Sequence, residues 1–171
     1  MAFIGVISNV KCFENIESEV LNKKLYKNIE VIHITPNSIQ NFKNIKFEVI
    51  LIEEELEKFK DNERNLDKIC KSSKYVLVNT DLNQNYTKKN DEKINVITYG
   101  LNQSANITVA SITDLNLSIY VQKNMTNIFG KNIEIEERRI KINENSILKT
   151  YEILIIYILR LICTKSIIKE I

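Results

Sequence analysis

Five short, predominantly apolar runs constrain the fold of this chain more than any other feature. They are rich in Ile and Val, and they occupy residues 2–8, 29–34, 47–52, 75–78 and 94–99. A strand that is buried on both faces is continuously apolar rather than alternating, as in a parallel sheet covered on both sides. The segments 14–25 and 62–71, which lie between these runs, carry apolar residues at helical spacing. The pattern predicts βαβ units, and hence an α/β fold with a mainly parallel sheet and flanking helices.

The pattern changes after residue 100. Residues 107–112, 117–123 and 133–142 predict strands separated by turns, with Gly130 in the loop between the last two. This part is interpreted as a small antiparallel β extension over residues 101–142. Residues 143–165 predict a long helix that packs between layers, with Asn143 or Asn145 as its N-cap. We therefore expect one domain over 1–171, with a βαβ core over 1–100.

Bulk properties exclude several classes of protein. The 171 residues suit one domain, and a net charge of +2 does not indicate a nucleic-acid partner. The apolar run at 153–162 contains Arg160 and is too short to span a bilayer, so a buried helix is expected rather than a membrane segment. Three widely separated cysteines and the lack of a recognisable signal peptide favour a reducing, cytoplasmic setting and argue against a zinc site.

Residues 95–112 carry the most specific local pattern. A β-branched run ends in Tyr99-Gly100, a short polar loop follows, and a second β-branched run begins at Ile107. The physical interpretation is strand, tight turn, strand. Since the chain has only three glycines, we expect Gly100 to lie where the backbone requires one.

This stretch resembles the "TYG…A…I.A..I" segment in the central, ATP-binding domain of the Mur ligase family. Residues 75–81 (YVLVNTD) look like that family's "vvN.DD" strand end. Residues 47–53 resemble a strand that ends in a glutamate near the metal, and Glu144-Asn145 falls where the family has a His-Asn pair. The resemblance implies a nucleotide edge with Asn79, Asp81 and Asn145, and it implies Glu53 and Asp81 as candidate magnesium ligands.

The family's phosphate loop has the form G-T-N-G-K-T, and residues 7–12 (ISNVKC) stand in its place. Ser8, Asn9, Lys11 and Cys12 are therefore candidate vestigial nucleotide-binding residues. Ile7 and Val10 replace the two glycines that let backbone N–H groups wrap a phosphate, and a β-branched residue disfavours that loop shape. Cys12 replaces a hydroxyl, although magnesium prefers oxygen ligands. Lys11 alone can attract a phosphate, but a solvated lysine is the simpler expectation.

The resemblance covers only the central domain, and no part of the sequence matches the family's N- and C-terminal substrate domains. We therefore expect a non-catalytic, Mur-ligase-like protein (a pseudoenzyme) that acts as a binding or scaffold module, with a protein partner or self-association. No catalytic residue and no cofactor is assigned. One alternative is an ATP-binding subunit of an ATP-dependent carboxylate–amine ligase, which would use ATP and magnesium. The other is a small-molecule-sensing α/β module unrelated to the ligases.

Structural or solvent-exposed roles, rather than functional ones, are expected for the remaining polar residues. His33, the only histidine, lies in an apolar run and is expected to be structural. Glu53, Glu54 and Asp81 are expected to be exposed loop acids rather than magnesium ligands. The charged residues between Glu134 and Arg139 predict an exposed hairpin face.

Overall fold

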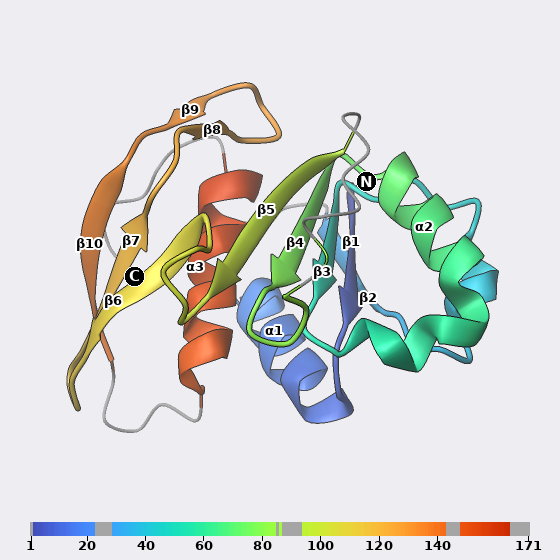
Figure 1. The fold of residues 1–171 in the computed structure, drawn as a ribbon, viewed down its shortest axis with the longest axis horizontal. Coiled ribbons are helices and arrows are strands. Elements are labelled where there is room, and N and C mark those ends of the chain that lie inside the picture. The colour runs from blue at the N-terminus through green and yellow to red at the C-terminus, as the bar shows by residue number, and fades with distance from the viewer. Residues whose placement is uncertain (1, 23–28, 85, 87–93, 143–147, 165–171) are drawn as a thin grey trace.

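The computed structural model describes residues 2–22, 29–84, 86, 94–142 and 148–164. It is an α/β structure in which an eight-stranded sheet has the order β10-β7-β6-β5-β4-β3-β1-β2 and a small two-stranded sheet pairs β8 with β9. Helices lie on both faces of the large sheet (Figure 1). The predicted fold class is confirmed.

The elements have the following bounds. The strands are β1 (Ala2–Ile7), β2 (Ile29–His33), β3 (Val49–Ile52), β4 (Tyr75–Asn79), β5 (Asn95–Gly100), β6 (Ile107–Ile112), β7 (Asn116–Val121), β8 (Met125–Thr126), β9 (Asn132–Ile133) and β10 (Glu136–Lys141). The α-helices of the described residues are α1 (Val10–Asn22), α2 (Glu63–Ser72) and α3 (Thr150–Cys163), and the 3-10 segments are η2 (Ile39–Phe42) and η3 (Leu56–Asn62). Across these described residues, no helix has the length and apolar run needed to cross a bilayer.

Strands β1 to β5 form the parallel part of the sheet. β1 lies between β2 and β3, and β4 lies between β3 and β5, all with parallel pairing. Every residue of β3 and β4 is buried, which explains their continuously apolar sequences. The order β2-β1-β3-β4-β5 is that of a doubly wound sheet, in which ligands bind outside the carboxyl ends where the order reverses, here between β1 and β3.

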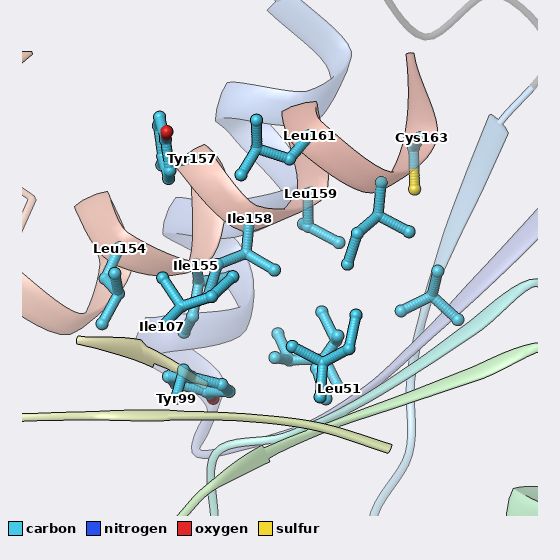
Figure 2. Packing of buried hydrophobic residues seen from close by; sticks show 14 of the residues in the cluster. Leu51, Tyr99, Ile107, Leu154, Ile155, Tyr157, Ile158, Leu159, Leu161 and Cys163 are labelled. Carbon is cyan, nitrogen blue, oxygen red and sulfur yellow. The ribbon is translucent and has the colours of Figure 1, made fainter. Parts of the chain in front are cut away.

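Two hydrophobic cores lie on opposite faces of this sheet. One face packs against α1 and α3, and Figure 2 shows side chains such as Leu51, Tyr99 and Ile107 meeting the apolar residues of α3. The other face packs against α2, η2 and η3 through residues such as Ile50 and Ile52. α3 is buried along most of its length because it lies against both the parallel strands and the extension, as its nearly all-apolar sequence predicted.

The extension beyond β5 differs in one respect from the prediction. β7 pairs antiparallel with both β6 and β10, as expected. β6, however, is parallel to β5, with Tyr99 opposite Ile107 and Gly100 opposite Thr108. The predicted tight turn is therefore wrong: residues 101–106 carry the chain across to a neighbouring parallel strand, and sequence spacing does not distinguish that path from a hairpin.

Several element boundaries also differ from the prediction. α1 begins at Val10 rather than Glu14, so Lys11 and Cys12 lie in its first turn. α3 begins at Thr150 with Lys149 as its N-cap, so neither Asn143 nor Asn145 caps it, and both lie outside the described residues.

The expected strand 133–142 is divided into β9 and β10. Gly130, whose φ of 76° favours glycine, lies in the connection from β7 to β10, as expected. It forms the turn between β8 and β9, which pair as an antiparallel hairpin.

Candidate functional site

The carboxyl ends of β1, β3, β4 and β5 meet at one edge of the sheet, and this edge holds most of the predicted site residues. Ser8 follows β1, Glu53 follows β3, Asn79 ends β4, and Gly100 ends β5. α1 and α3 both begin at the same edge (Figure 1). Since parallel strands share one direction, residues far apart in sequence are brought together here.

The connection from β1 to α1 consists only of Ser8 and Asn9. The side-chain Oδ1 of Asn9 accepts a hydrogen bond from the Cys12 N–H at 3.0 Å, the bond of an N-cap. The Ser8 hydroxyl donates to the Asn9 carbonyl at 3.0 Å. His33 Nε2 donates to the Ser8 carbonyl at 2.8 Å, and its ring stacks on Phe13 with centroids 4.6 Å apart. These contacts account for His33 as a structural residue, and they use the polar groups of the turn internally.

Glu53 forms the centre of a polar cluster that joins three strands. The Asn79 amide donates to both of its carboxylate oxygens, at 3.1 and 3.0 Å, and the Tyr99 hydroxyl donates to Oε2. Burial raises the pKa of Glu53 above its ordinary value, against the lowering effect of these two donors. Glu53 is half-buried, as are Glu54 and Asp81, so the expectation of exposed loop acids is wrong for all three.

Cys12 lies beside this cluster, on the first turn of α1. Burial raises the pKa of its thiol from 9.0 to about 12, and the nearby carboxyl groups of Glu53 and Glu152 act in the same direction. Cys12 is 6% exposed and is therefore a neutral, buried thiol at neutral pH.

Asp81 organises a second cluster between β4, β5 and α3. Its carboxylate accepts hydrogen bonds from the Leu101 N–H at 2.6 Å, the Asn102 amide at 2.6 Å and the Tyr151 hydroxyl at 2.9 Å. Partial burial opposes ionisation, but these donors outweigh it, and the pKa of Asp81 lies below its ordinary value.

A side chain at position 100 would crowd the same carboxylate. A Cβ atom built on Gly100 would lie 2.7 Å from Asp81 Oδ2 and 3.0 Å from the Asn102 amide nitrogen. The Tyr99-Gly100 pair therefore contributes one hydroxyl to the Glu53 cluster and one Cβ-free position to the Asp81 cluster.

The first turn of α3 is fastened to this edge by two neighbouring side chains. Tyr151 bonds Asp81, as described above. Glu152 is 4% exposed; it accepts the Lys149 N–H at 2.8 Å and the side-chain amide of Asn15, on α1, at 3.1 Å. This turn therefore joins α1 and the strand ends into one packed unit.

A scan of the chain against protein-family models gives no match, and a search of curated proteins finds no relative. Within the described ranges, no three His, Cys, Asp or Glu side chains converge as a metal site requires.

The structure brings together Ser8, Asn9, Cys12, Glu53, Asn79 and Asp81 at one edge, as the order of the elements implied. Lys11 is exposed on the first turn of α1, as expected of a solvated lysine. Asn145 lies outside the described residues. Sequence reasoning missed the roles of Asn102, Tyr151 and Glu152, because their partners are far away in the sequence and no local pattern indicates them.

Proposed function

We propose that this chain is a non-catalytic α/β module, of the Mur-ligase central-domain type, that acts by binding a protein partner or another copy of itself. The β1–α1 connection carries the proposal. A phosphate loop needs several residues whose N–H groups point inward around an anion. Here the connection has two residues, Ser8 and Asn9, and the Asn9 side chain takes the N–H of Cys12.

The carboxylates of the site give a second line of support. Each oxygen of Glu53 already accepts the Asn79 amide, and Asp81 accepts three hydrogen bonds. Magnesium prefers several free oxygen ligands, and a buried thiol at position 12 is a poor substitute for one. The described residues of this edge therefore fit an ATP–magnesium site poorly.

Calorimetric titration with ATP and magnesium tests the proposal. We expect no saturable heat up to millimolar nucleotide, in the wild type and in Lys11→Ala alike. Lys68→Ala is the matched control, because Lys68 is an exposed lysine on α2, which packs on the opposite face of the sheet from α1. Binding tighter than about 100 μM that is lost in Lys11→Ala and kept in Lys68→Ala would overturn the proposal and favour an ATP-binding subunit.

A further inference from the structure

Within the described residues, β10, the outermost strand of the large sheet, has no strand paired on its outer side. β10 is the last strand in the sheet order, and it pairs only with β7 (Figure 1). The opposite edge strand, β2, has the sequence IEVIH and carries no comparable alternation of charge. An edge strand with free N–H and C=O groups is a template for pairing with another chain. β10 is therefore the edge at which the side chains can specify a partner.

The register identifies which residues of β10 face the open side. The Ile142 N–H donates to the Leu115 carbonyl at 2.8 Å, next to the pairs that align Ile140 with Leu117 and Arg138 with Ile119. Hydrogen-bonded and non-bonded pairs alternate in an antiparallel ladder. The even-numbered residues of β10 consequently bond β7, whereas Glu137, Arg139 and Lys141 direct their backbone groups outward. Among the described residues, no backbone or side-chain partner is found for the N–H groups of Glu137 and Arg139.

The charged side chains of β10 alternate between a half-buried and an exposed face of the sheet. Glu136 and Arg138 are half-buried on the face toward α3, where Glu136 accepts the Tyr157 hydroxyl at 3.2 Å and the Arg138 guanidinium at 2.8 Å. Glu137 and Arg139 are exposed on the other face. The prediction of an exposed charged face is therefore correct for Glu134, Glu137 and Arg139, and wrong for Glu136 and Arg138.

We propose that β10 pairs antiparallel with β10 of a second copy of this chain, in the register that sets Glu137 opposite Arg139 of the partner. This register joins the outward backbone groups in hydrogen-bonded pairs, and each of the two symmetric pairs places opposite charges face to face. In the register centred on Arg139, the two Arg139 side chains would face each other on the exposed face, beside two Glu137–Lys141 pairs. At the symmetry centre, each Arg138 is already neutralised by its own Glu136.

The paired strands are short, and a contact of this size lies near the low end of specific interfaces, so a weak dimer is expected. The resulting sheet would continue across both copies. This inference is independent of whether the carboxyl ends of β1, β3, β4 and β5 bind a nucleotide, since β10 lies at the far side of the extension (Figure 1).

Sedimentation velocity over roughly 1 to 500 μM, which brackets a weak complex, tests the pairing. We expect concentration-dependent dimerisation of the wild type. Arg139→Glu should weaken it by about tenfold or more, because two attractive pairs become repulsive. The charge swap Glu137→Arg with Arg139→Glu should restore it. Arg64→Glu, at an exposed position on α2, makes the same change in net charge as a control and should leave it unchanged.

A monomer across the whole range would overturn the inference, and β10 would then be an edge protected by its charges. A dimer that is indifferent to Arg139→Glu would also overturn it, since the contact would lie elsewhere. The circular dichroism of each variant shows whether it folds.

The register has its own test, which does not depend on charge. Arg138 faces Arg138 of the second copy as a non-hydrogen-bonded pair, for which Cα atoms lie about 4.5 Å apart, within disulfide reach. Arg138→Cys should therefore form an intermolecular disulfide under mild oxidation, whereas Glu137→Cys, which is not opposite itself, should form little. The three native cysteines are buried and do not compete. Equal cross-linking of both variants would contradict the proposed register.

Discussion

Gly100→Ala tests whether the close approach of Asp81 explains the glycine at the end of β5. The new Cβ would lie 2.7 Å from Asp81 Oδ2, so this oxygen must move. The same oxygen accepts the Leu101 N–H at 2.6 Å and the Tyr151 hydroxyl at 2.9 Å. Displacing it therefore weakens two charge-assisted hydrogen bonds at once.

The expected loss follows from these two bonds. A hydrogen bond to a charged group contributes about 1.5–3 kcal/mol when buried. Because Asp81 is only partly buried, solvent screens the interaction, and we take the low end for both bonds together, about 2 kcal/mol. For a chain of this length, that loss lowers the melting temperature by roughly 4–8 °C.

A double-mutant cycle with Asp81→Ala separates the contact from other effects of the methyl group. Urea denaturation gives the free energy of unfolding of the wild type, both single variants and the double variant. We expect Gly100→Ala to cost about 2 kcal/mol in the wild type and less than about 0.5 kcal/mol when Asp81 is absent. Gly130→Ala, where no atom lies within 4 Å of the added Cβ, is the control: its cost comes from its positive φ and should be equal in both backgrounds. An equal cost of Gly100→Ala in both backgrounds would refute the steric reasoning.

Three further predictions concern this edge of the sheet and the buried cysteines. Asn9→Ala should lower the free energy of unfolding by about 1 kcal/mol through loss of the α1 N-cap, whereas Asn9→Asp should retain most of it; urea denaturation measures both, and equal losses would contradict a capping role. Burial raises the pKa of Glu53 above 4.5, so its contribution favours the folded state below pH 4.5 and is lost as pH rises through the raised value. The free energy of unfolding, measured at stepped pH, should therefore change less over that window for Glu53→Gln than for the wild type. An equal pH dependence in both proteins would contradict the raised pKa of Glu53. Burial raises the pKa of the thiols of Cys12, Cys70 and Cys163 to about 12. All three thiols should therefore react slowly with a thiol reagent at pH 8 in the native protein and fast in the denatured protein. A thiol that reacts fast in the native protein would contradict the burial of that cysteine.

Much of the parallel core could be predicted from the sequence, because burial on both faces leaves a local mark. The strands β3 and β4 are apolar at every position or nearly so, and this pattern indicates where they lie in the sheet. The apolar character of residues 153–162 likewise predicted a buried helix. Gly100 could be recognised as a constrained position, although the atom that constrains it could not.

The candidate site is less predictable, because its side chains find partners across the fold. Glu53 was expected to be an exposed acid, but Asn79 and Tyr99 from neighbouring strands enclose it. The roles of Tyr151 and Glu152 depend on where α3 docks, which no local pattern records.

The sequence by itself determined the fold class, the buried strands and the lack of glycine in residues 7–12, since these depend on the composition of short segments. Only the tertiary structure decided that β6 runs parallel to β5, that the acids of the carboxyl edge are held by internal donors, and which backbone groups of β10 face outward. The physical reason is common to all three. Strand direction, hydrogen-bond partners and the alternation of bonded and non-bonded pairs are relations between distant segments, and the spacing of apolar residues along the chain does not encode them.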